Sequence, residues 1–247
     1  KASGAVTGSG VIGATSDVHF SAGSATLGSD GRLTADGALD ASATAGDFDL
    51  SGGQVNAANI TLTPTNGSIR SGADALILTP GTLTLSAGTI DLSGGAAHGW
   101  NVILRGGGVQ NASGLLQSLG ALSTELTGTL DNQSGEIFAS GDMTLAAANL
   151  FNKGGVISHG GSGTLALNIG TGLDNGSGLI ATNGALDLKA ATLGNRGRIS
   201  GKRAATLNIT ELVANGGLIA SDGALSVTAD RIGGQGGSFE SAGPLTF

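Results

Sequence analysis

Apolar residues alternate with other residues in short segments along the whole chain. In the second half they form pairs two positions apart: Met143 and Leu145, Leu165 and Leu167, Leu186 and Leu188, Leu207 and Ile209, and Leu225 and Val227. A period of two is typical of a β-strand with one buried face. Gly, Asn, Ser and Asp stand between the segments, and these residues favour turns. The pattern predicts many short strands joined by tight corners, with little helix.

A second pattern recurs about every 20 residues. An apolar residue, one variable residue and an Asn precede a Gly-rich corner, and this Asn recurs at Asn111, Asn132, Asn152, Asn175, Asn195 and Asn215. An apolar residue follows each corner, at Leu116, Ile137, Ile157, Ile180, Ile199, Ile219 and, one repeat further on, Phe239. Both series lengthen at the same repeat, which predicts an insertion between Asn152 and Ile180.

Three short strands fill a unit of this length, and such a unit buries its apolar face only by stacking on its neighbours. The sequence therefore predicts an all-β fold, a right-handed parallel β-helix of roughly 12 coils and on the order of 55–60 Å in length. A leucine-rich repeat would need a helical side, and a β-propeller needs about 40 residues per blade. We expect one interior column made of Leu145, Leu167, Leu188, Ile209 and Val227.

The first half of the chain carries paired apolar residues without the recurrent Asn, for example Leu39 with Ala41 and Ile60 with Leu62. We therefore expect a single β-helix over residues 1–247, with less regular coils over 1–108 and regular Asn-marked repeats over 109–247. Coil boundaries before about residue 105 are not assigned by the pattern, and residues 102–104 and 115–122 are candidates for a local departure from the coil. The chain starts without Met, which suggests a segment of a longer protein.

Composition narrows the class further. Of 247 residues 47 are Gly, three are Pro and none is Cys, which excludes a disulfide scaffold and a Cys-ligated metal site. Gly without a three-residue period is not collagen, and Gly at this density disfavours a long helical bundle. A hydrophobic content of 39% and a net charge of −7 disfavour disorder. No run of 18 apolar residues offers a transmembrane helix, so the chain is not expected to span a membrane.

Two stretches carry a family resemblance, Leu130-Asp131-Asn132-Gln133-Ser134-Gly135-Glu136-Ile137 and Gly184-Ala185-Leu186-Asp187-Leu188-Lys189-Ala190. They resemble repeats of the filamentous haemagglutinin family, large bacterial exoproteins that include adhesins and the stalks of contact-dependent growth-inhibition effectors. The resemblance covers residues 109–247 well and 1–108 in texture. It implies two-partner secretion through an outer-membrane transporter, display at the cell surface, and a role in adhesion or reach.

The six recurrent Asn residues form the predicted structural ladder. Each lies two positions after an inward apolar residue, so it is expected to point inward and to stack its amide on the Asn of the next coil. Asn also tolerates the left-handed conformation that a sharp corner requires. A row of one residue type favours a structural role over a ligand site.

Catalytic, cofactor and metal sites are not predicted. The three histidines, His19, His98 and His159, are far apart in sequence and lack metal-ligand spacing, and His159 is expected in an exposed loop. The nucleophile-elbow, phosphate-loop and calcium-nonapeptide motifs do not occur.

Carboxylates offer the best case for an enzyme, because parallel β-helices can host polysaccharide lyases and hydrolases. Asp30, Asp36, Asp40, Asp47 and Asp49 are close in sequence, and paired carboxylates can cleave a glycoside. Phe48 and Leu50 alternate with Asp47 and Asp49, however, which makes the Asp side the solvent side of an amphipathic strand. Trp100 is the one aromatic residue suited to stack on a sugar.

Basic residues gather near the C-terminal end of the sequence. Stacking of coils there predicts a modest patch that attracts polyanions, made of Lys189, Arg196, Arg198, Lys202, Arg203 and Arg231. Nucleic-acid binding is not expected, because the net charge is −7 and no aromatic residues interleave with these cations.

The leading function hypothesis is a rigid stalk section of a secreted, surface-exposed adhesin or growth-inhibition effector. Its expected partners are the outer-membrane transporter during export and an unidentified surface receptor or glycan. The alternatives are a carbohydrate-active β-helix enzyme and a glycan-binding module. An enzyme would need long loops beside acidic residues, whereas the corners after residue 109 are uniformly short.

Overall fold

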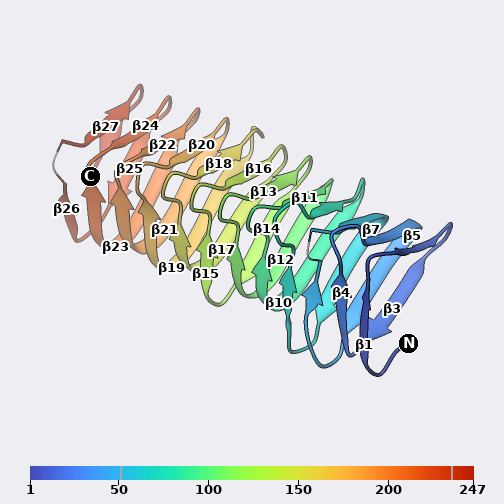
Figure 1. Cartoon of the computed structure of the whole chain (residues 1–247). Helices are drawn as coiled ribbons and strands as arrows, with labels where there is room; N and C mark the ends of the chain where they lie inside the picture. The colour runs from blue at the N-terminus through green and yellow to red at the C-terminus, as the bar shows by residue number, and fades with distance from the viewer. Residues whose placement is uncertain (51, 235) are drawn as a thin grey trace.

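The computed structural model describes residues 1–50, 52–234 and 236–247, and they form a rod of stacked coils with the two termini at opposite ends (Figure 1). The described residues contain no helix, and 65% of the chain is strand, which confirms the all-β prediction. The strands wind into a parallel β-solenoid of about 12 turns, roughly 20 residues apart. Within residues 1–50, 52–234 and 236–247 there is accordingly no helix long and apolar enough to cross a membrane.

Each coil contributes one strand segment to each of three parallel ladders, which we call A, B and C. Ladder A contains β2 (Val11–Ala14), the first parts of β5 (Arg32–Ala43) and β7 (Gln54–Pro64), β9 (Leu76–Leu78), β11 (Ala96–Gly99), β13 (Leu115–Ser118), β16 (Glu136–Ala139), β18 (Val156–His159), β20 (Leu179–Thr182), β22 (Arg198–Gly201), β24 (Leu218–Ser221) and β27 (Ser238–Ser241).

Ladder B follows ladder A in every coil. It contains β3 (Val18–Ala22), the later parts of β5 and β7, the first parts of β10 (Thr82–Asp91) and β12 (Asn101–Gln110), β14 (Leu122–Leu126), the first parts of β17 (Met143–Phe151), β19 (Thr164–Asn175), β21 (Ala185–Asn195) and β23 (Ala205–Asn215), β25 (Leu225–Thr228) and β28 (Leu245–Thr246).

Ladder C completes each coil. It contains β1 (Ala5–Gly8), β4 (Ser24–Leu27), β6 (Phe48–Asp49), β8 (Ser68–Arg70), the later parts of β10 and β12, β15 (Thr129–Asp131), the later parts of β17, β19, β21 and β23, and β26 (Arg231–Gly233).

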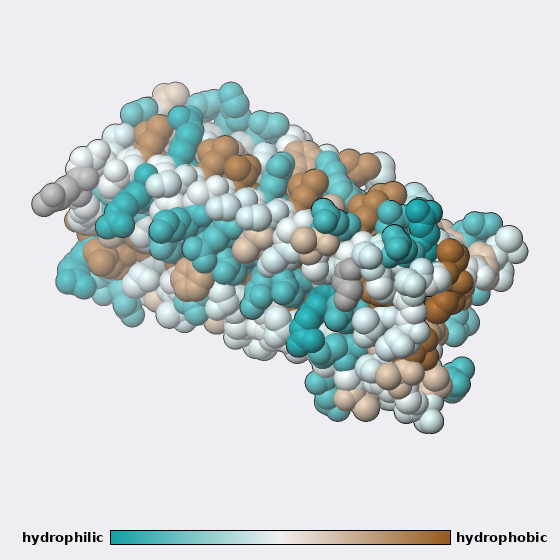
Figure 2. All heavy atoms as spheres, viewed as in Figure 1, coloured by the Kyte–Doolittle hydropathy of each residue, from teal (hydrophilic) through white to brown (hydrophobic). Residues whose placement is uncertain are grey.

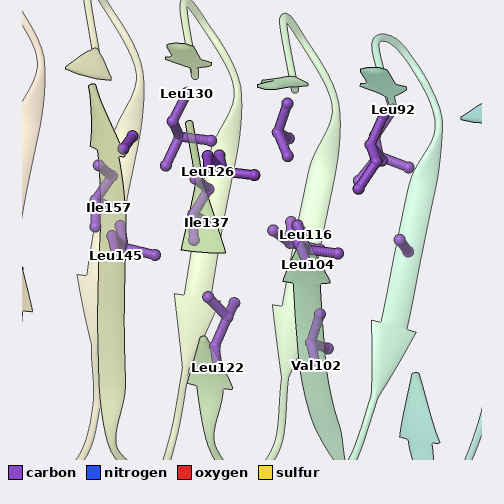
Figure 3. Packing of buried hydrophobic residues seen from close by; sticks show 14 of the residues in the cluster. Leu92, Val102, Leu104, Leu116, Leu122, Leu126, Leu130, Ile137, Leu145 and Ile157 are labelled. Atoms are coloured by element: carbon purple, nitrogen blue, oxygen red, sulfur yellow. The ribbon is translucent and has the colours of Figure 1, made fainter. Parts of the chain in front are cut away.

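The interior is one continuous apolar core, because the inward residue of each strand packs on its counterpart in the next coil. Figure 3 shows part of it, with Leu116, Leu130, Ile137, Leu145 and Ile157 directed into the space between the ladders. The second predicted marker forms an uninterrupted column, from Leu116 to Phe239, by strand pairing in register.

One predicted column is wrong at a single position. Leu145 pairs with Leu167, and Leu167 with Leu188, as expected, but Leu188 then pairs with Leu207 rather than Ile209. Ile209 pairs with Ala190, because β23 carries three successive inward residues and the sequence pattern showed two of them as a pair. Val227 continues the column from Leu207.

The predicted insertion is present and consists of two separate changes. Ala139 pairs with His159 and Met143 with Leu165, so the corner between β18 and β19 has two extra residues, within Gly160 to Gly163. One further residue is accommodated by a bulge in β19, where the pairing with β17 shifts between Ala147 and Asn149. Together these account for the longer repeat.

The first half is built from the same coils as the second. Val11 pairs with Arg32, Arg32 with Gln54, and Gln54 with Leu76, so these coils advance by 21, 22 and 22 residues. The expected departure at residues 102–104 and 115–122 does not occur, since β12, β13 and β14 pair in register with the coils on both sides.

Candidate functional site

The six recurrent Asn residues form a hydrogen-bonded file inside the rod, where ladder C turns into ladder A. Each Nδ2 donates to the Oδ1 of the next Asn, at 2.8 Å for the first four links and 2.9 Å for the link from Asn195 to Asn215. All six side chains are buried. Each Nδ2 also donates to backbone carbonyls beside the corner, for example that of Asn132 to Gly135 and Val156. The side-chain amides thus form hydrogen bonds both with one another and with the backbone carbonyls of the corners. Their polar atoms are used to hold the structure together.

The left-handed conformation that we expected of Asn belongs to a different residue. It lies two positions later, at Ser113 (φ 55°), Ser134 (φ 56°), Gly154 (φ 64°) and Ser177 (φ 56°). None of the six Asn residues has a positive φ, and each lies at the end of a ladder C strand or directly after it. The prediction that Asn takes the left-handed conformation at these corners is therefore wrong.

In the first four Asn corners, a Gly three positions after the Asn lets two coils approach closely. A Cβ atom on Gly135 would lie 1.9 Å from the carbonyl oxygen of Asn111, and one on Gly155 would lie 2.0 Å from that of Asn132. Neither distance is compatible with a side chain. The corner motif therefore needs both residues, the Asn for its amide and the Gly for its missing side chain.

The file begins at Asn111, and the same corner position is apolar in most of the earlier coils. Asp91 pairs with Gln110, so Leu92 precedes Asn111 in this column, and Leu50 and Ser71 lie further back. The Oδ1 of Asn111 is buried without a hydrogen-bond partner, because Leu92 offers no donor. The recurrent Asn does not mark this continuation in the sequence. Gly95, three residues after Leu92, was the signal that could have revealed it.

The three histidines lie apart, and the structure corrects our placement of His159. His19 Nδ1 lies 3.4 Å from Asp40 Oδ2 on the outward side of ladder B. His98 Nδ1 lies 2.8 Å from Gln117 Oε1 on ladder A. His159 is 1% exposed inside β18, with Nδ1 2.7 Å from Thr182 Oγ1, and not in an exposed loop. Burial lowers the pKa of His159, and the backbone of Gly141 and the carboxylate of Asp142 partly oppose this shift.

Among the described residues, no group of three or more metal-ligating side chains is close enough to hold an ion. The carboxylates expected on an amphipathic strand lie on ladder C. Asp47 is bound to the next coil, where it forms an ion pair with Arg70 and accepts the Ser68 backbone N–H at 2.7 Å. Trp100, 56% exposed, lies at the corner between ladders A and B, away from that strand. The geometry makes Asp47 a link between coils.

The six basic residues do not converge on one surface, which corrects the single patch that stacking suggested. Lys189 is on ladder B, where it pairs with Asp187, and Arg231 is on ladder C. Arg198 and Lys202 line one small hollow beside ladder A, and Arg196 lines another at the corner before it. Lys202 also lies 3.6 Å from Asp222, so part of its charge is balanced. Arg203 follows Lys202 in the exposed corner.

Comparison with known proteins identifies one family. The haemagglutinin repeat matches five overlapping segments, residues 1–63, 49–134, 120–177, 160–211 and 181–246. No curated protein and no solved structure matches the chain.

Proposed function

The chain belongs to the haemagglutinin repeat family, and we propose that it serves as a rigid stalk section of a secreted or surface-exposed bacterial adhesin or growth-inhibition effector. The observation that supports this proposal is the unbroken stacking of three parallel ladders around one core. Each coil is held to both neighbours by backbone hydrogen bonds, which resists bending and stretching. The function of such a section is to set the distance between the cell and a distal domain.

Export through an outer-membrane partner and contact with a receptor or glycan on another cell belong to the same proposal. A solenoid that grows by adding coils suits export in an extended state, since each coil packs on the one before it. The Asn file, the corner glycines and the Asp47–Arg70 pair all act between coils. They serve the rod rather than a bound molecule.

The stalk proposal is tested by removing whole coils. Deleting residues 132–174 joins Asp131 to Asn175 and removes two complete repeats, so the file and the core remain continuous. We expect small-angle scattering to show a folded rod about 10 Å shorter, at about 4.8 Å per coil. A matched deletion of residues 132–141, half a coil, should fail to fold. In the proposed longer exoprotein, the two-coil deletion should leave surface display intact. Contact with target cells should be reduced only partly, because the rod becomes shorter but stays folded.

The enzyme alternative has its own test. We expect the wild-type chain to cleave none of a panel of acidic and neutral polysaccharides. The Asp47→Asn and Asp49→Asn variants should likewise show no turnover, and their contact with target cells should be unchanged. Turnover that disappears in either variant would overturn the stalk proposal in favour of a carbohydrate-active enzyme.

A further inference from the structure

Ladder A carries, on its outward side, one file of residues in which apolar side chains predominate over several successive coils. Its first outward file, in the order of stacking, is Leu115, Glu136, Val156, Leu179, Arg198 and Leu218. The four apolar members are partly exposed. Figure 2 shows the result as a row of hydrophobic patches along one edge of the rod, over the strands labelled β13 to β24 in Figure 1.

The equivalent outward file of ladder B is different in kind. Its members over the same coils are Ser123, Thr144, Ala166, Asp187, Thr206 and Ser226. Small polar residues of this kind are what a solvated strand carries. Burial in the core therefore does not explain the Leu and Val residues outside ladder A, and partly exposed apolar side chains repeated in one file, interrupted by two charges of opposite sign, suit an interaction surface.

The two charged members of the file are placed symmetrically. Glu136 lies one coil before Val156, and Arg198 lies one coil after Leu179. A two-fold axis between β18 and β20, parallel to the strands, exchanges these coils and reverses the rod. It sets Glu136 of one copy against Arg198 of the other, twice, with Val156 against Leu179 at the centre and Leu115 against Leu218 outside. A two-fold interface must be complementary to itself in this way.

We propose that ladder A is a self-association face on which two copies of this chain pack side by side and antiparallel. Among the described residues neither Glu136 nor Arg198 forms an ion pair within its own chain, and both are exposed. Each is therefore available to the other copy. The charges select the antiparallel register, because a parallel arrangement in register would place like charges opposite one another.

The shape of the face agrees with the same register. A shallow hollow of about 640 Å³ follows ladder A beside the corner, and Leu115, Glu136 and Val156 line it. The two-fold axis brings Leu218, Arg198 and Leu179 of the other copy over this hollow. The corners also differ: those holding Ser113 and Ser134 include the left-handed residue, whereas the corners after Asn195 and Asn215 are one residue shorter. Longer corners of one copy thus lie opposite shorter corners of the other.

The size of the face indicates a weak complex. Six coils at about 4.8 Å and strands of four residues at about 3.3 Å cover roughly 400 Å² per copy. A stable interface usually buries about 800 Å² per partner. The pairing is therefore expected at high protein concentration, or between rods held close together on a surface, where the effective concentration is high.

The test is sedimentation equilibrium of the full 247-residue chain over a concentration series. Glu136→Arg and Arg198→Glu should each raise the dimer dissociation constant by about tenfold, since each makes both charge contacts repulsive. The double variant, and an equimolar mixture of the two single variants, should both return to the wild-type constant, because opposite charges then meet again. Leu179→Asp should abolish the dimer, while the matched Leu212→Asp, outward on ladder C, should not.

The relative orientation of the two copies is tested separately by disulfide cross-linking. The chain contains no Cys, so introduced cysteines can react only with one another. A mixture of Leu115→Cys and Leu218→Cys chains should form disulfide-linked dimers on mild oxidation, and Leu115→Cys alone should not. Cross-linking of Leu115→Cys alone would show a parallel pair and overturn the proposal. So would a wild-type chain that stays monomeric at several hundred micromolar, or a charge-swapped mixture that fails to recover.

Discussion

Replacing one Asn of the file with Leu should cost very different amounts at its middle and at its start. In Asn152→Leu, the Oδ1 of Asn175 loses its donor from Asn152 and stays buried, and the Nδ2 of Asn132 loses one acceptor. A buried polar atom left without its partner costs about 1–3 kcal/mol. Asn132 keeps two carbonyl acceptors, at Gly135 and Val156, so it adds little. We expect the free energy of unfolding to fall by about 2–3 kcal/mol.

Asn111→Leu makes the same chemical change at the start of the file. The Oδ1 of Asn111 is already unpartnered, and the substitution only transfers this defect to the Oδ1 of Asn132. The new Leu follows Leu92 in the column, where an apolar side chain already packs. The expected loss is below about 1 kcal/mol, because the number of unpartnered amide oxygens is unchanged.

The two variants are compared by urea unfolding followed by circular dichroism at a wavelength that reports strand. Hydrogen exchange at the corners on either side gives a local measure that does not assume two-state unfolding. Equal losses in both variants would show that the file contributes nothing beyond each Asn's own corner. A loss below 1 kcal/mol for Asn152→Leu would refute the argument from unpartnered amides.

Three further predictions concern the core, the corner and a buried histidine. Leu188→Asp buries an unpaired charge between Leu167 and Leu207 and should lower thermal stability by several kcal/mol, whereas an unchanged melting temperature would contradict the assigned register. Gly135→Ala should destabilise the rod strongly in the same assay, because its Cβ would lie 1.9 Å from the Asn111 carbonyl, while the control Gly88→Ala, whose Cβ would lie 3.4 Å from its nearest neighbour, should be mild. Since the pKa of His159 is lowered in the folded state, the unfolded state binds its proton first, so the free energy of unfolding should fall as the pH drops below about 6.5 and level off below the folded pKa. Subtracting the pH profile of His159→Gln isolates this contribution, and a profile unchanged by the substitution would show that His159 is not the titrating group.

Much of the fold follows from the sequence because two markers share one period. The Asn and the apolar residue after each corner are chemically distinct, so each identifies the same place in successive coils. The first half lacks that distinction. Leu50 and Leu92 occupy the corner column there, and nothing separates them in the sequence from Leu residues that face inward from a strand. The sequence therefore did not show where the coils of the first half begin and end, although these coils have the same structure as those of the second half.

The errors at single residues have physical causes of the same kind. His159 follows Ile157 at a spacing of two, which placed it on the inward side, but its polarity suggested a loop. Thr182 in the next coil supplies the hydrogen bond that makes this burial tolerable, and a contact across 23 residues is not visible in a local pattern. For the six basic residues the prediction failed for a different reason, because residues close in sequence and in neighbouring coils can lie on different ladders. Stacking brings coils together, but the ladder of each residue decides the direction of its side chain.

The error at Ile209 also shows what the Asn file contributes that Leu columns do not. Leu188 packs on Leu207, but Ile209, two residues further along, is equally apolar and points the same way. A coil that slipped by two residues would therefore keep most of its apolar contacts. The same slip would move Asn215 away from Asn195 and bury amide groups without partners, at about 1–3 kcal/mol each. The Asn file thus penalises the misregistered coils that the apolar core tolerates, and it does so in the half of the rod where bulges in β19 and β23 would otherwise make the register ambiguous.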